Sequence, residues 1–81
     1  MRIQVLCFAI ARDLLGTARL DLELEAGATV EMALEVIAAR SPAIRPLLDT
    51  LRVALDEEFV SRSDVLQPGS TLALLPPVSG G

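Results

Sequence analysis

The sequence predicts an α+β domain in which helices cover one face of a mixed five-stranded β-sheet. Three observations support this class. Hydrophobic residues alternate in the extended segments near both ends of the chain, a central segment has helical spacing, and the segments follow the order strand, strand, helix, strand, strand, strand. The chain has 81 residues, 52% of them hydrophobic, which is enough for one packed core and too few for a second.

Two strands are expected in the first third of the chain. Residues 2–9 alternate, with Ile3, Val5 and Cys7 on one side, and both sides are apolar, as is typical of a central strand. Residues 20–25 alternate leucine with acidic residues, which predicts a strand with one side in water. Residues 11–16 are expected to form only a short turn, of hairpin length, between the two.

The main helix is expected to begin after Thr29, whose hydroxyl suits an N-cap, and to end before Pro42. The residues with helical spacing are Val30, Ala33, Leu34, Ile37 and Ala38. A second, shorter helix with the same spacing is expected over residues 44–51.

Three more strands are expected, over residues 52–55, 59–60 and 71–75. Because a helix separates the first strand from the last, these two are expected to pair in parallel at the centre of the sheet. This is the β-grasp, or ubiquitin-like, layout, and it is expected to occupy residues 1–75.

Residues 76–81 are expected to form a tail that projects from the sheet. Pro76 and Pro77 lack backbone donors and favour an extended conformation, and Gly80 and Gly81 have no Cβ, so they suit a channel too narrow for side chains. The alternative is a frayed chain end without a role.

The composition excludes several classes of function. The chain has no His, no Lys and a single Cys, so an imidazole base, a Schiff-base amine, a P-loop lysine and a thiolate metal cluster are all excluded. No metal site is expected, and the lone Cys favours a cytoplasmic protein. The net charge is -4 and the arginines are scattered singly, so neither nucleic acid nor a membrane is an expected partner. The expected partner is a protein with a basic surface.

Several motifs together resemble the MoaD family, the small sulfur-carrier subunits of molybdopterin synthase. The most specific is the final Leu-Leu-Pro-Pro-Val-Ser-Gly-Gly, and the others are Val-Leu-Cys-Phe-Ala at residues 5–9, Arg-Asp-Leu-Leu-Gly at 12–16, Gly-Ala-Thr-Val at 27–30 and Pro-Gly at 68–69. The chain departs from the family at two turn positions. Asp56 stands where Asn is common, and Ser70 where an acidic residue often follows Pro-Gly.

The resemblance implies a carrier cycle at the carboxylate of Gly81. A ubiquitin-activating-like adenylyltransferase would use ATP to adenylate Gly81, and a sulfur donor protein would then leave a thiocarboxylate there. The tail residues Pro76, Pro77, Val78, Ser79 and Gly80 would enter a channel of the large synthase subunit, in a heterotetramer. There the sulfur would pass to cyclic pyranopterin monophosphate to form a dithiolene. The chain itself would bind no cofactor, and catalytic side chains are expected on the large subunit.

A partner interface is expected near the tail. If Val5 and Leu74 lie in the core, alternation puts Leu6, Phe8 and Leu75 on the other side of the sheet. Phe8, Phe59 and Leu75 would then form an exposed apolar patch, with Arg12 beside it, and matching positions in the family contact the large subunit. The alternatives are that Phe59 is buried under a loop and that Arg12 is only solvated. Cys7 is expected to be a small buried hydrophobe.

Two other functions share these features. One is sulfur transfer for thiazole synthesis, tRNA thiolation or cysteine synthesis. The other is covalent protein modification in the manner of ubiquitin, or a plain binding module. A chain without Lys cannot form lysine-linked polymers of itself, which weakens only the polymerising form of the second alternative.

Overall fold

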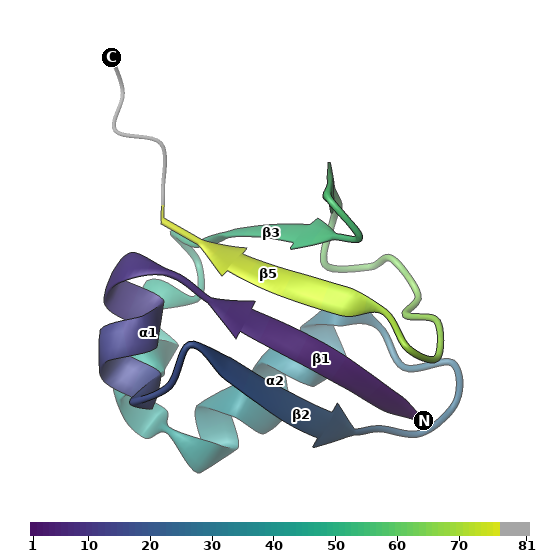
Figure 1. Cartoon of the computed structure of the whole chain (residues 1–81), viewed down its shortest axis with the longest axis horizontal. Helices are drawn as coiled ribbons and strands as arrows, with labels where there is room; N and C mark the ends of the chain where they lie inside the picture. Colours follow the sequence, from purple (N-terminus) through teal and green to yellow (C-terminus); the bar gives the residue numbers. More distant parts are fainter. Residues whose placement is uncertain (77–81) are drawn as a thin grey trace.

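A computed structural model describes residues 1–76 and contains the expected five-stranded mixed sheet (Figure 1). The strands are β1 (Arg2–Cys7), β2 (Arg19–Glu23), β3 (Arg52–Leu55), β4 (Glu58–Phe59) and β5 (Thr71–Leu75). They lie in the order β2-β1-β5-β3-β4, and β1 pairs in parallel with β5 while the other neighbours are antiparallel. The β-grasp prediction is therefore confirmed, with the predicted central pair.

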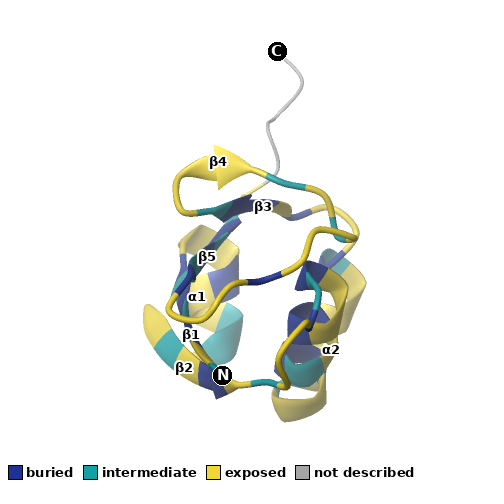
Figure 2. Ribbon diagram, turned by 90° about the vertical axis from the view of Figure 1, so that its right-hand side faces the viewer, coloured by how far each residue is buried: buried dark blue, intermediate teal, exposed yellow. Residues whose placement is uncertain are grey.

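The core lies between one face of the sheet and the helix α2 (Val30–Arg40). Figure 2 shows the buried residues of α2 on the side that faces the sheet. The sheet contributes its alternating buried residues to the same core, and the five predicted helix residues are all buried: Val30, Ala33, Leu34, Ile37 and Ala38. The alternation and the helical spacing therefore identified both sides of the core.

The start of α2 is capped as expected, because the Thr29 hydroxyl accepts a hydrogen bond from the Met32 N–H at 3.3 Å. We predict that Thr29→Ala lowers the free energy of unfolding by about 1 kcal/mol, since one helix N–H loses its acceptor. Urea denaturation followed by circular dichroism measures this loss. Thr29→Ser keeps the hydroxyl and should lose less than half as much. An equal loss in both variants would mean that the cap is not the cause.

The segment after β1 is a helix and not the predicted turn. Helix α1 covers Ala9–Leu15 and ends at Gly16, whose φ of 74° is left-handed and whose N–H donates to the Arg12 carbonyl at 2.9 Å. A seven-residue helix has too few residues for a visible helical period and is too short to be stable alone. Packing stabilises it instead, because Ala11 is completely buried in the core.

The second predicted helix is also different in the structure. Residues 42–47 form a 3-10 helix, η1 (Pro42–Leu47), which begins earlier than the predicted α-helix and ends sooner. Pro46 has no N–H to donate to the preceding turn, which accounts for a short 3-10 turn in place of an α-helix. The four residues with helical spacing in this segment still pack inward, because Ile44, Leu48 and Leu51 lie in the core and Leu47 is partly buried against it. Among residues 1–76 no helix is long and apolar enough to cross a membrane.

Candidate functional site

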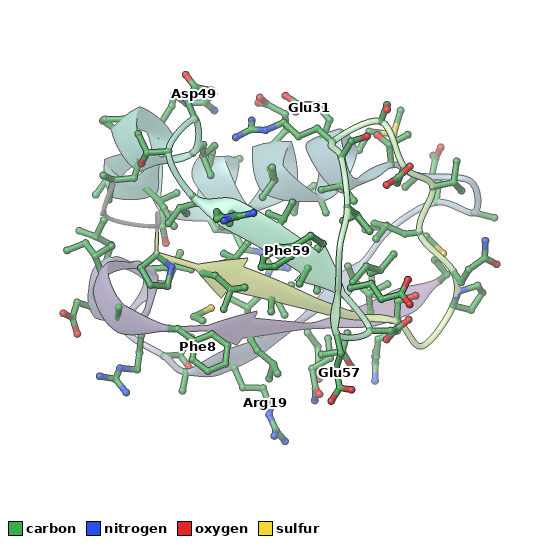
Figure 3. The ribbon with its side chains drawn as sticks, turned by 90° about the horizontal axis from the view of Figure 1, so that it is seen from above. Phe8, Arg19, Glu31, Asp49, Glu57 and Phe59 are labelled. Carbon is green, nitrogen blue, oxygen red and sulfur yellow. The ribbon has the colours of Figure 1, made fainter. Side chains whose placement is uncertain are left out.

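The face of the sheet that α2 leaves uncovered is called here the open face. Leu6 pairs with Ala73, and Ala73 pairs with Ala54, so these three side chains lie in a row on this face. Their strand neighbours on the opposite face, such as Val5 and Leu72, are completely buried in the core. Figure 3 shows Phe8, Arg19 and Glu57 on the side of the sheet opposite Glu31 and Asp49.

The open face is hollowed beside the point where β5 ends. Leu75 is the last residue of β5 and Pro76, which follows it, is exposed; these two residues are called the tail root. The Phe8 N–H donates to the Leu74 carbonyl at 3.3 Å, which holds Phe8 next to the tail root with 44% of the residue exposed. The hollow is lined by Leu6, Phe8, Ala54, Thr71, Ala73 and Leu75, with Asp56 and Glu57. An apolar hollow thus adjoins the tail root.

Phe59 is exposed, as the patch requires, and is not covered by a loop. It lies on β4 opposite Ala54, so its ring is on the open face, and 63% of the residue is exposed. The Arg52 guanidinium lies 4.3 Å from the centre of the ring. At an exposed site such a cation–π contact contributes about 0.5–1 kcal/mol, which is enough to favour one orientation of the Arg52 side chain.

Arg12 lies on α1, one helical turn after Phe8, since its N–H donates to the Phe8 carbonyl at 3.4 Å. Its side chain is exposed, and none of the ion pairs among residues 1–76 includes it. Its expected place in a partner interface stays a prediction. So do the predicted roles of Pro77, Val78, Ser79, Gly80 and Gly81, which lie outside the described residues.

The acidic turn between β3 and β4 has a structural role. Asp56 and Glu57 have φ values of 49° and 73°, so both are left-handed, as in the tight hairpin turns that Asn favours. The Asp56 carboxylate accepts a hydrogen bond from the Thr71 N–H at 3.0 Å, which ties this turn to the start of β5. The departure from Asn to Asp at position 56 is therefore compatible with the fold.

Cys7 is buried as predicted, with 2% of the residue exposed, and burial raises the pKa of its thiol above the ordinary value of 9.0. A raised pKa means that the folded state favours the protonated thiol. The resulting stability is fully present below pH 9.0 and is lost as the pH rises through the raised value.

We therefore predict that the free energy of unfolding falls as the pH rises from 9 toward 11, and that Cys7→Ala lacks most of this fall. The effect can be assigned to Cys7 because the chain has no Tyr and no Lys, the other side chains that ordinarily titrate in this range. Urea midpoints across the range measure the effect. Parallel curves for the two proteins would contradict the prediction.

The predicted site omitted three residues of the open face: Arg19, Arg52 and Ala54. The period-two rule would have found the last two, because Val53 and Leu55 face the core and their neighbours must face the other way. Alternation with Leu20 and Leu22 would also have put Arg19 on the exposed side of β2, but only its pairing with Leu6 of β1 places it beside the hollow.

Comparisons with known proteins agree with this architecture. The ThiS family model matches residues 5–81. A Chlamydomonas reinhardtii protein named molybdopterin synthase sulfur carrier subunit is 39% identical over the full length of both chains. An Arabidopsis thaliana protein of the same name is 35% identical over all of this chain and 84% of its own length.

Solved structures give the same result. A Pyrococcus furiosus protein assigned as molybdopterin converting factor, subunit 1, is 27% identical with a TM-score of 0.90, over 96% of this chain and 99% of its own. SAMP1 from Haloferax volcanii is 26% identical with a TM-score of 0.89 over the full length of both chains. The chain therefore belongs to the ThiS family and, as its motifs predicted, to the MoaD family of molybdopterin synthase sulfur carrier subunits.

Proposed function

We propose that this chain is a sulfur carrier of molybdenum cofactor biosynthesis and acts as the small subunit of molybdopterin synthase. The observation that carries the proposal is its full-length similarity, at 35% and 39% identity, to two proteins named for that role. The composition is consistent with a carrier, because a chain without His or Lys lacks the imidazole base and the amine nucleophile on which many enzymes depend.

The chemistry would take place at the carboxylate of Gly81. A carboxylate is a poor electrophile, so an oxygen of Gly81 first attacks the α-phosphorus of ATP on an activating enzyme, which forms an acyl-adenylate and releases pyrophosphate. The outer sulfur of a persulfide on the donor then attacks the acyl carbon and displaces AMP, which leaves an acyl disulfide. A thiol attacks the donor's sulfur, forms a disulfide with it and releases the thiocarboxylate. The large subunit would transfer this sulfur to cyclic pyranopterin monophosphate, and two such transfers make the dithiolene.

Docking on the large subunit would use the open face and the tail. Phe8, Phe59 and Leu75 would provide the apolar contact and Arg12 a charged one, while Pro76, Pro77, Val78, Ser79 and Gly80 lead Gly81 into the partner's channel. The exposure of Phe8 and Phe59 and the apolar hollow beside the tail root support this arrangement. The word "subunit" in the relatives' names supports a partner subunit for this chain too.

Reconstitution tests the proposal directly. The full chain is incubated with an activating enzyme, ATP and a persulfide donor, and intact-mass spectrometry should detect one oxygen-to-sulfur exchange at Gly81. The product, mixed with the large subunit and cyclic pyranopterin monophosphate, should yield the dithiolene. No exchange under conditions that charge a known carrier would contradict every carrier role, and exchange without dithiolene would leave a carrier with another client.

One observation favours protein modification as a second candidate. SAMP1, whose name stands for small archaeal modifier protein 1, matches this chain over its full length, although with lower identity than the sulfur carriers. A modifier would form an amide bond between the Gly81 carbonyl and an amine of a target protein. Tagged chain expressed in cells, followed by denaturing purification, would reveal such conjugates as heavier bands, which a carrier would not form.

A further inference from the structure

The seven arginines of the chain divide into two groups. Four have a partner within the described residues: Arg2 pairs with Glu23 at 2.8 Å, Arg45 with Glu35 at 3.4 Å, Arg62 with Glu31 at 3.5 Å, and Arg40 donates to the Asp21 carbonyl at 3.5 Å. The other three, Arg12, Arg19 and Arg52, have no carboxylate within 4.0 Å among residues 1–76. These three cations are therefore available to a group outside the described part of the chain.

These three arginines lie at the same end of the sheet, Arg19 and Arg52 on its open face and Arg12 on the adjoining helix α1. Arg52 is directly opposite Leu75 of the tail root, and Arg19 is directly opposite Leu6, so each flanks the apolar hollow from a different side. Arg12 is one helical turn after Phe8. They come from three different elements. Strand pairing brings Arg19 and Arg52 to this end of the sheet, and Arg12 follows from the position of α1 directly after Phe8.

Local contacts hold two of these arginines in place. The Arg52 guanidinium lies over the Phe59 ring at 4.3 Å. The backbone of Arg19 is bound on both sides by the Thr17 hydroxyl, which donates to the Arg19 carbonyl at 2.8 Å and accepts from the Arg19 N–H at 3.2 Å. The side chain of Arg52 and the backbone of Arg19 are thus held in place before a partner binds.

The spacing of the strands keeps these charges independent. Arg19 on β2 and Arg52 on β3 are three strand steps apart, about 14 Å across the sheet at ~4.8 Å per step. This exceeds the Debye length of about 8 Å at physiological ionic strength, so the two cations repel each other only weakly. At the far end of the same hollow lie two carboxylates, Asp56 and Glu57. The hollow is therefore cationic at the tail root and anionic at the other end.

We infer that Arg12, Arg19 and Arg52 form a cationic border around the tail root, which steers and orients docking on a partner surface that presents carboxylates around an apolar contact. The charge at this site is positive, whereas the net charge of the chain is -4. The basic partner surface that the composition predicted would therefore not complement this part of the chain. The inference rests on the proposed function for the partner's identity, the large synthase subunit, and it deepens that function by giving the chemistry of the partner's surface.

Association kinetics test the inference. Stopped-flow or surface-based measurement with the purified large subunit would compare the full chain with Arg19→Gln, Arg52→Gln and the double variant. At low ionic strength we expect each single change to lower the association rate constant by about twofold to fivefold and the double change by about tenfold. In 1 M salt, where the Debye length is ~3 Å, the differences should nearly disappear. Dissociation should change less than association.

Arg45→Gln is the matched control, because it removes the same charge from η1, where Arg45 pairs with Glu35. It should leave the association rate almost unchanged. An equal slowing by Arg45→Gln would mean that only the net charge of the chain matters. No slowing by Arg19→Gln and Arg52→Gln would mean that the partner surface is not acidic at this site. Either result would overturn the inference. Failure of the wild-type chain to bind the large subunit would instead contradict the proposed function.

Discussion

Deletion of Gly81 should abolish thiocarboxylate formation and leave the thermal unfolding transition almost unchanged. The deletion moves the terminal carboxylate onto Gly80, about 3.5 Å short of its original position along the chain, and a displacement of this size removes reacting groups from bonding distance. Among the described residues the core cluster and the strand pairs end at Leu75, so we expect the fold to tolerate the deletion. Intact-mass spectrometry after reaction with activating enzyme, ATP and sulfur donor measures the first effect, and calorimetry the second.

The deletion variant should still bind the large subunit through the open face, which separates loss of chemistry from loss of docking. A thiocarboxylate on the shortened chain would contradict the assignment of Gly81 as the acceptor. A large decrease in the unfolding temperature would mean that the last residue has a structural role.

Phe8→Glu should weaken binding to the large subunit by at least about tenfold, roughly 1.4 kcal/mol. Phe8 lines the apolar hollow beside the tail root, and the few interface residues whose truncation costs about 2 kcal/mol or more cluster in well-packed pockets near the centre of an interface. A glutamate there would place a charge against apolar partner atoms, and it would also oppose the carboxylates that we infer around them. Titration calorimetry of the wild-type chain and the variant measures the difference.

The matched control for this experiment is Met32→Glu. Met32 is also a large exposed apolar residue, at 55% exposure, but it lies on α2, which covers the opposite face of the sheet. Its replacement should leave affinity for the large subunit within about twofold. If both variants bind as tightly as the wild-type chain, the open face is not the docking surface.

Local patterns predicted most of the fold. The alternation of Ile3, Val5 and Cys7 identified the core side of β1, and the helical spacing from Val30 to Ala38 identified the buried side of α2. Both patterns are long enough to be visible because each element buries a full side along its length. The predictions were wrong for α1 and η1. In both, a few residues are buried by distant parts of the chain, and in η1 Pro46 also interrupts the hydrogen bonding.

The candidate site was predictable only where it followed from alternation. Phe8 and Leu75 were placed near the tail because they flank the ends of strands whose core sides were already known. The exposure of Phe59 was not decided by sequence, since a two-residue strand has no visible period and a loop could have covered it. The pairing of Phe59 with Ala54 and its contact with Arg52 decide its position on the open face.

The sequence by itself determined the order of the five strands and α2, the two sides of the core, and the absence of His and Lys, which excludes an imidazole base and a Schiff-base amine. Only the tertiary structure decided that Arg12, Arg19 and Arg52 lie at the same end of the sheet as the tail root. The physical reason is that residue spacing reports the local backbone. Arg19 and Arg52 are instead placed by the pairing of β2 with β1 and of β3 with β5, between residues far apart along the chain, and Arg12 by the packing of α1 against the core.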